Sequence, residues 1–311
     1  MRILVTGASG FVGSKVIGAL AAEGEVVAAV RRPGSAPWAD GEVLVPDIGP
    51  DTDWREALEG VDVVLHLAAR VHVMRDESAD PLAAHRQVNA LGTRALAEQA
   101  ADVGVSRFVF MSTIKVNGEQ TRGQPYQGSD IPDPRTPYGL SKLEAERALA
   151  EVANGSAMEA VVLRAPVIYG VGAKGNIRRI IALIRRGIPL PLGSVRNRRT
   201  MLAADNLVEW VKAAVTSRHL GALPVLMGDP RPVSTAELVL RLAQGMGRAP
   251  RLVNFPPRLL GLAGSLIGHG DDMARLLEDL EVAPSLDAFD APPTLIDPAQ
   301  ALQELGAASG A

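Results

Sequence analysis

Tyr138 and Lys142 are the two residues whose types and spacing point most directly to chemistry. They stand four positions apart, so on a helix both side chains lie on one face. A tyrosine of ordinary pKa, near ~10, is a poor acid–base group at neutral pH. A neighbouring ammonium group and the positive charge of an oxidised nicotinamide would lower that pKa. The pair therefore predicts a tyrosine that transfers a proton beside a nicotinamide cofactor.

Ser112 and Thr113 place two hydroxyl groups directly after the apolar run 108–111. That run reads as a buried parallel strand, and ligands bind at the C-terminal ends of such strands. We expect a hydroxyl here to donate a hydrogen bond to a substrate oxygen while Tyr138 transfers the proton. The alternative is that both hydroxyls satisfy backbone groups in a turn.

A glycine-rich segment, Thr-Gly-Ala-Ser-Gly-Phe-Val-Gly, occupies residues 6–13 after the first expected strand. Gly7 allows a tight turn, Gly10 lets the backbone approach a pyrophosphate, and Gly13 allows close packing of helix on strand. The helix that begins here offers N–H groups and positive potential to phosphates. This strand–turn–helix context predicts a dinucleotide site, and the alternative is a tight turn without a ligand.

Arg31 and Arg32 follow the second expected strand, and no carboxylate comes before Asp40. An acidic residue here would bind a ribose 2′-hydroxyl, whereas an arginine accommodates a 2′-phosphate, so NADP(H) is favoured over NAD. The alternative is that both arginines belong to a solvated turn. Asp47 and Ile48 follow the next short strand, where we expect them to contact the adenine.

Together these motifs resemble the extended short-chain dehydrogenase/reductase superfamily, and within it the NAD-dependent epimerase/dehydratase family of nucleotide-sugar enzymes. The resemblance covers nearly the whole chain and implies Tyr138, Lys142 and Thr113 as catalytic residues, with Ser112 helping Thr113. The motif at 62–69 is similar to the family's fourth-strand motif and adds further cofactor contacts. With those argued above, the expected cofactor-binding residues are Gly7, Ser9, Gly10, Phe11, Val12, Gly13, Arg31, Arg32, Asp47, Ile48, Leu67, Ala68, Ala69, Tyr138 and Lys142.

A second set of sequence similarities concerns the residues that would bind the substrate. Segments 112–119 and 197–200 look most like bacterial surface-polysaccharide enzymes, which are nucleotide-sugar 4-epimerases or 4-keto-reductases. Asn176 and Arg199 match positions that contact the nucleotide diphosphate in the family. The chain also departs from the family's epimerases at three positions. Arg31 stands in place of an aspartate, Val71 in place of a phosphate-binding lysine, and Val167 in place of a frequent asparagine.

These departures favour an NADP(H)-dependent reductase of a 4-keto nucleotide-diphospho-sugar, with a UDP-sugar as the expected substrate, in surface-polysaccharide precursor synthesis. The alternative is an NAD-dependent nucleotide-sugar 4-epimerase similar to UDP-glucose 4-epimerase. A third alternative is a cofactor-sensing protein without catalysis. The Tyr138/Lys142 pair counts against that third alternative, because such proteins commonly lose it.

Residues 160–204 contain no acidic residue but nine basic ones. Arginines hold the negative charges of a nucleotide diphosphate efficiently, so we expect one of Arg196, Arg198 and Arg199 to contact that group. The remaining helical arginines are expected on solvated faces; these are Arg178, Arg179, Arg185 and Arg186. Nucleic acid is not an expected partner, because interleaved aromatics are lacking and the whole chain has 32 basic against 35 acidic residues.

Composition bounds the class of protein further. The chain has no cysteine, and its five histidines show no helical metal pair, so we expect no metal site and a reducing compartment. Residues 2–5 already read as a strand, which leaves no room for a signal peptide. The apolar stretch 259–267 is about half of a membrane span. We expect a cytoplasmic protein without membrane insertion, with a two-fold homodimer as the common default.

The elements that position these residues alternate between short β-branched runs and longer helical patterns, which predicts a Rossmann-like, doubly wound α/β fold. Strands are expected near 2–5, 26–30, 61–67, 108–111 and 158–163, and helices near 13–22, 53–58, 84–103, 139–153 and 205–217. A smaller, mostly helical substrate lobe should bind the sugar. We expect residues 1–165 and 200–227 in the dinucleotide-binding domain and residues 166–199 and 228–311 in the lobe, with a frayed end after Gly306.

Overall fold

The computed structural model of the chain describes residues 1–71, 80–173, 175–217, 224–266 and 270–310. A seven-stranded sheet in the order β3-β2-β1-β4-β5-β6-β9 forms the centre, and all of its neighbouring strands are parallel. The order reverses between β1 and β4, which is the point where doubly wound sheets bind ligands. The strands are β1 (Arg2–Thr6), β2 (Glu25–Val30), β3 (Gly41–Leu44), β4 (Val63–His66), β5 (Arg107–Thr113), β6 (Glu159–Ala165) and β9 (Val225–Leu226).

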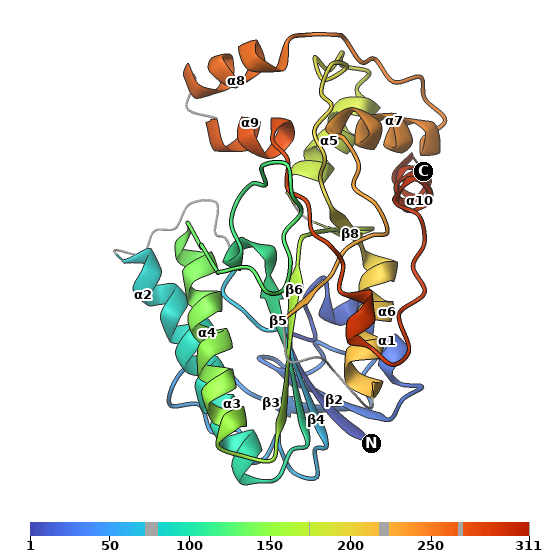
Figure 1. Cartoon of the computed structure of the whole chain (residues 1–311). Helices are drawn as coiled ribbons and strands as arrows, with labels where there is room; N and C mark the ends of the chain where they lie inside the picture. The colour runs from blue at the N-terminus through green and yellow to red at the C-terminus, as the bar shows by residue number, and fades with distance from the viewer. Residues whose placement is uncertain (72–79, 174, 218–223, 267–269, 311) are drawn as a thin grey trace.

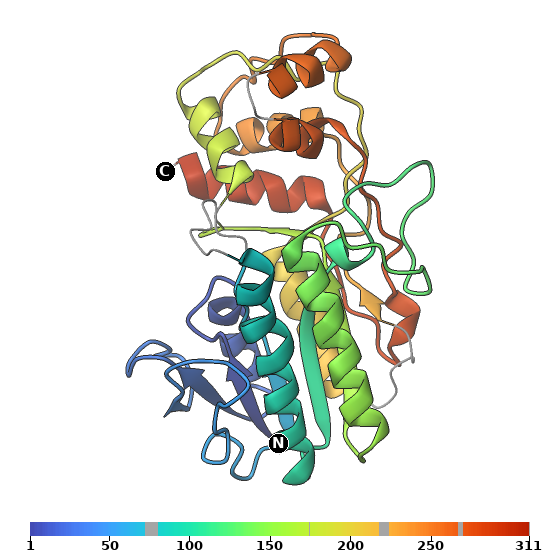
Figure 2. The same ribbon diagram turned by 90° about the vertical axis from the view of Figure 1, so that its left-hand side faces the viewer.

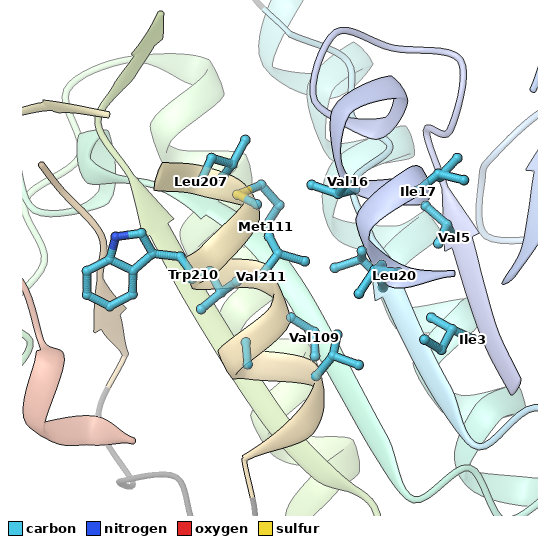
Figure 3. Packing of buried hydrophobic residues seen from close by; sticks show 14 of the residues in the cluster. Ile3, Val5, Val16, Ile17, Leu20, Val109, Met111, Leu207, Trp210 and Val211 are labelled. Atoms are coloured by element: carbon cyan, nitrogen blue, oxygen red, sulfur yellow. The ribbon is translucent and has the colours of Figure 1, made fainter. Parts of the chain in front are cut away.

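Helices cover both faces of this sheet, as Figure 1 shows. On one face lie α1 (Gly13–Leu20) and α6 (Ala204–Thr216). Figure 3 shows their side chains, among them Val16 and Val211, beside Val109 and Met111 of β5. The opposite face carries a nearly continuous helix made of α2 (Pro81–His85), the π-helical turn η1 (Arg86–Leu91) and α3 (Gly92–Asp102), followed by α4 (Pro137–Asn154). The fold is therefore the expected Rossmann-like one.

A second, mostly helical lobe lies beyond the C-terminal ends of the strands (Figures 1 and 2). The short parallel pair β7 (Val167–Tyr169) and β8 (Met201–Ala203) lies where the chain passes into it and returns. The lobe has its own core, formed around Ile180, Leu242 and Leu302. Its helices are α5 (Asn176–Arg185), α7 (Thr235–Gly245), α8 (Pro257–Leu266), α9 (Gly270–Leu277) and α10 (Pro298–Gly310), and short 3-10 turns, η2 (Ile114–Val116) and η3 (Leu286–Ala288), lie elsewhere in the chain.

A buried carboxylate, that of Asp229, links the chain segments that pass between the sheet domain and the lobe. Asp229 follows β9 and accepts hydrogen bonds from Tyr169 Oη (2.8 Å), Ala203 N (2.9 Å) and Asn206 Nδ2 (2.7 Å). Asn206 in turn bonds the backbone of Ile296, just before α10. Four segments that are distant in sequence therefore meet at one point. Burial raises the pKa of Asp229, while these three donors oppose that rise.

Three local expectations are wrong. Residues 53–58 form turns instead of a helix, because the Gln99 side chain bonds the backbone of Thr52 and Trp54 and fixes the segment. In the segment expected to be frayed, Gly306 to Ala311, residues 306–310 are helical because α10 packs closely on α7, and Ala311 lies outside the described residues. A Cβ on Gly306 would lie 2.3 Å from the carbonyl oxygen of Leu242.

Part of the expected lobe, residues 285–289, packs on the sheet domain instead. Ser285 N donates to Leu226 O of β9 at 2.9 Å. Phe289 contacts Trp210 of α6, with ring centroids 5.7 Å apart. Phe289 is buried in the core beside α6, so hydrophobic burial draws this part of the chain back to the sheet.

Candidate active site

The glycine turn has no space for larger side chains at its first and third glycines. Gly7 has a φ of 71°, and a Cβ there would lie 2.7 Å from Ala68 N. A Cβ on Gly13 would lie 2.4 Å from Gly7 O, so only glycine lets α1 start this close to β1. The N–H groups of Ser14, Lys15 and Val16 bond the carbonyl oxygens of Gly10 and Val12, so an anion here would meet the turn before them and the positive end of the α1 dipole. Ser9, Gly10, Phe11 and Val12 complete the turn.

His66 at the end of β4 acts as a fixed structural link beside this turn. Its Nδ1 lies 2.7 Å from Thr6 Oγ1, and its Nε2 lies 3.0 Å from Thr93 Oγ1. Because Thr93 donates its own proton to Asn89 O, the Nε2 atom of His66 carries the proton. Burial lowers the pKa of His66 to about 3, so the ring is neutral. Thr6 Oγ1 also accepts from Ala68 N at 3.1 Å, which orients segment 67–69 toward the glycine turn.

The residues expected at the ribose and adenine follow β2 and β3. Arg31 and Arg32 are both exposed directly after β2. Asp47 is exposed after β3, and Ile48 is half-buried against α3, where a Cβ on Gly92 would lie 2.7 Å from its Cγ2 atom. Neighbouring strand ends therefore bring the four expected residues to the same edge of the sheet as the glycine turn.

Tyr138 lies in the first turn of α4. Thr136 caps this helix by accepting a hydrogen bond from Gly139 N at 3.2 Å, and Pro137 suits the first helical position. The tyrosine ring lies 5.9 Å from the ring of His85. Burial raises the pKa of Tyr138 to about 12, so the chain's own charges do not produce the expected lowering. A phenolate here needs the added positive charge of a bound oxidised nicotinamide.

Lys142 is buried one turn further along α4. Its Nζ donates to Met111 O of β5 at 2.9 Å and lies 4.4 Å from the centre of the Phe110 ring. Burial lowers the pKa of Lys142 to about 7, and the charge of Glu146 opposes that lowering. The structure thus brings the α4 ammonium group to the end of β5, beside the two expected hydroxyls.

Thr113 and Ser112 have different environments. Thr113 is buried at the end of β5, where its Oγ1 accepts a long hydrogen bond of 3.4 Å from Lys115 N. Ser112 instead donates its proton to Glu146 in a buried network. Its hydroxyl is therefore not available to donate to a substrate, and this arrangement does not support a role for Ser112 as helper of Thr113.

Glu146 and Arg164 are the site residues that the sequence reasoning missed. Arg164 Nη2 lies 2.6 Å from Glu146 Oε2, and both side chains are buried. Arg164 Nη1 also donates to Asn117 Oδ1 at 3.0 Å. A signal was present, because Glu146 follows Lys142 at the same four-residue spacing that links Lys142 to Tyr138.

On the lobe side, Asn176 opens α5 and Arg199 precedes β8. Arg199 is half-buried, its Nη1 donates to Glu278 O at 2.9 Å, and burial lowers its pKa. Glu119, which pairs with Lys115 just beyond Thr113, lies close enough to act on the charge of Arg199. The lobe thus brings an arginine toward the end of β5.

The other arginines of this stretch have local partners or are exposed. Arg198 pairs with Glu281 at 2.8 Å, and Arg196 bonds the carbonyl oxygen of Gly193 at 2.8 Å. Gly170 and Gly172 lie against the ring of Phe11, so the loop into the lobe contacts the glycine turn. In the part of the chain that the structure describes, no cluster of three or more acidic, histidine or cysteine side chains forms a candidate metal site.

Comparison with known proteins identifies the family. Residues 3–224 match the model of the NAD dependent epimerase/dehydratase family. A UDP-glucose 4-epimerase of Vibrio cholerae is 40% identical over 285 residues, covering 90% of this chain and 86% of that protein. A 3-diazoavenalumate denitrifying reductase of a Streptomyces species is 31% identical over 278 residues, covering 84% and 88%.

A solved structure shows the same fold. The UDP-glucuronic acid 4-epimerase of Bacillus cereus, in complex with NAD, superposes with a TM-score of 0.77 at 21% identity, covering 100% of this chain and 96% of that one. The family match extends from the glycine turn through the Tyr138/Lys142 pair to the end of α6. A cofactor-sensing protein without catalysis is therefore set aside. The chain is an enzyme of the extended short-chain dehydrogenase/reductase type, and it belongs to the NAD-dependent epimerase/dehydratase family.

Proposed function

We propose that this enzyme is an NAD-dependent 4-epimerase of a nucleotide-diphospho-sugar, with a UDP-sugar as its substrate. The observation that carries the proposal is the buried Tyr138–Lys142 pair on α4, with Lys142 held on β5, in a chain 40% identical to a UDP-glucose 4-epimerase. This reverses our order of preference from sequence, which put the reductase first.

The glycine turn fits a dinucleotide, because no Cβ fits at Gly7 or Gly13, which brings the backbone of the turn close to β1, and because the positive end of the α1 dipole begins there. Gly7, Ser9, Gly10, Phe11, Val12 and Gly13 would hold its pyrophosphate, with the residues after β2, β3 and β4 along the adenosine. When bound, NAD supplies a reversible hydride acceptor for the sugar carbon.

The chain's own residues handle the proton and the geometry. Tyr138 Oη would take the proton of the sugar hydroxyl as that carbon is oxidised, and return it after the ketone presents its other face. Lys142, held on Met111 O, would add its charge to that of the bound oxidised nicotinamide, which the phenolate needs at this buried position. Thr113 would hold the same oxygen in line. Asn176 and Arg199 would bind the diphosphate from the lobe side.

The experiment that tests this proposal offers UDP-sugars with NAD to the purified enzyme and follows 4-epimers by NMR. We expect epimer formation without net change in cofactor. Tyr138→Phe should reduce turnover about one hundred- to ten-thousandfold while NAD still binds. Tyr126→Phe is the matched control, because that half-buried tyrosine donates its hydroxyl proton to Gln120 O and is not one of the expected site residues. Wild-type turnover in Tyr138→Phe would refute the assigned acid–base role.

A second candidate is an NADPH-dependent reductase of a 4-keto nucleotide-sugar. It is favoured by Arg31 and Arg32, which are exposed after β2 with no carboxylate until Asp40. Stoichiometric NADPH oxidation with a 4-keto sugar, and no epimer from any UDP-sugar, would establish it in place of the epimerase. A role in surface-polysaccharide synthesis stays a prediction of the family resemblance. A cytoplasmic location stays a prediction from composition, and a two-fold homodimer stays the common default.

A further inference from the structure

Two segments without acidic residues contribute to the small lobe. Residues 166–199 carry eight basic side chains, and residues 238–270 carry Arg241, Arg248, Arg251 and Arg258. The whole chain has a net charge of −3, so these segments concentrate positive charge in one part of an otherwise acidic protein. The next acidic residues, Asp271 and Asp272, come only at the start of α9.

The two segments pack directly on each other. Leu190 and Leu252 form a β-bridge, with Leu190 N on Arg251 O and Val253 N on Leu190 O, both at 2.8 Å. Arg248 Nη1 donates to Arg185 O at 3.0 Å, and Arg251 Nη1 donates to Gly187 O at 3.1 Å. The exposed residues Arg185, Arg186, Arg248 and Arg251 therefore lie near one another on the lobe.

Helix α8 adds an apolar stripe to that surface. Leu259, Leu262 and Leu266 are 51%, 62% and 87% exposed, and their spacing places them on one side of the helix. Leu260 faces inward and packs against the lobe core. Three more exposed apolar residues adjoin α8 in sequence or through the bridge: Ile188, Val253 and Phe255. We call these six exposed residues, with Arg185, Arg186, Arg248, Arg251 and Arg258, the basic apolar face.

We propose that the basic apolar face binds the surface of an anionic lipid bilayer. Leucine and phenylalanine side chains on one side of a helix enter the boundary between headgroups and acyl chains, and arginines beside them bind anionic headgroups. A second copy of this chain fits less well, because it would bring two sets of these arginines together. The contact is peripheral, since no described helix is long and apolar enough to cross a membrane.

The position of this face keeps it separate from the proposed catalytic residues. Figures 1 and 2 both place α8 at the end of the lobe that is most distant from the sheet. Tyr138, Lys142 and the glycine turn belong to the sheet domain. Docking through α8 therefore leaves turnover of a soluble nucleotide-sugar unchanged, and membrane binding can be tested independently of the proposed epimerase activity.

The test is sedimentation of the full chain with vesicles of phosphatidylcholine alone or mixed with phosphatidylglycerol. We expect binding to the mixed vesicles only, weakened by salt. The double variant Leu262→Ser/Leu266→Ser should lose binding, whereas Ile131→Ser, at a loop residue that is 90% exposed, should not. Arg258→Glu should weaken binding about tenfold, while Arg147→Glu, an exposed arginine on α4, should not.

Circular dichroism and turnover of a soluble UDP-sugar report whether each variant is folded. The proposal is overturned if wild-type protein does not sediment with anionic vesicles, or if the α8 variants bind as well as wild type. It is also overturned if the α8 substitutions abolish a concentration-dependent dimer and vesicle binding is absent, because a second copy then covers this face.

Discussion

Glu146 lies one helical turn after Lys142 on α4 and accepts hydrogen bonds from both Arg164 and Ser112. All four side chains are buried. The carboxylate thus links α4 to β5 and β6, and its charge supports the ammonium form of Lys142 against the cost of burial. Glu146 touches no expected ligand position and acts through Lys142, so it is a positioning residue.

Glu146→Gln should therefore change the pH dependence of turnover. Without the carboxylate, the pKa of Lys142 falls below its value of about 7, and the ammonium form is lost at lower pH. The alkaline limb of the kcat profile should move to lower pH. Arg164 also loses its buried partner, which should cost about 3–5 kcal/mol of unfolding free energy. Glu144→Gln, which removes the half-buried partner of the exposed Arg86, is the control, and equal profiles in both variants would contradict this role.

Gly13→Ala should disrupt the nucleotide site. The new Cβ would lie 2.4 Å from Gly7 O and 2.6 Å from Ala8 O, both backbone atoms, so the turn must move. We expect loss of measurable NAD binding by calorimetry and destabilisation of about 1–3 kcal/mol. Gly18→Ala in the same helix meets nothing within 4 Å and should stabilise the protein by about 0.5–1 kcal/mol. Normal NAD affinity in Gly13→Ala would show that the dinucleotide lies elsewhere.

Arg31→Asp should shift cofactor preference toward NAD. A carboxylate after β2 can accept hydrogen bonds from a ribose 2′-hydroxyl and repels a 2′-phosphate. We expect the ratio of NADP to NAD affinity to fall about tenfold or more, measured by fluorescence titration of both nucleotides. Arg147→Asp, on the exposed side of α4, should leave the ratio unchanged. An unchanged ratio in Arg31→Asp would place the ribose away from the end of β2.

His66 should make the protein less stable in mild acid. Its pKa is about 3 in the fold, against about 6.5 for an unperturbed imidazole, so only the unfolded chain binds a proton between these values. The contribution of His66 is complete above pH 6.5 and is lost as pH falls toward 3, at roughly 1.4 kcal/mol for each pH unit. Urea unfolding at several pH values should show a shallower slope for His66→Gln. Identical slopes would mean that the ring is not held neutral.

The Rossmann elements could be predicted from sequence because their signals are local. The β-branched runs, the glycine turn and the Tyr138–Lys142 spacing each lie within a few residues, and the structure contains the strands and helices that they predict. The network of Ser112, Glu146 and Arg164 could not be predicted in this way, because its members come from three elements that meet only in the fold.

The pKa of Tyr138 shows a different limit. Its direction depends on how deeply the phenol is buried, and no spacing in the sequence carries that information. The return of Phe289 to the sheet was hidden for a similar reason, because its partner Trp210 lies far away along the chain. The residue types thus indicated the chemistry of the site, whereas the direction of the pKa shift of Tyr138 depends on packing.

The meeting of four chain segments at Asp229 restricts how this enzyme could be recombined with its relatives. Tyr169, Ala203, Asp229 and Ile296 stand at four of the passages of the chain between the two halves, and one carboxylate and one amide side chain join them. A chimera that exchanges the sugar-binding half must therefore transplant every passage together with this junction. A chimera joined at only one of these passages would separate the buried Asp229 from its hydrogen-bond donors. New sugar specificities are therefore best built by changing loops within this enzyme's own sugar-binding half.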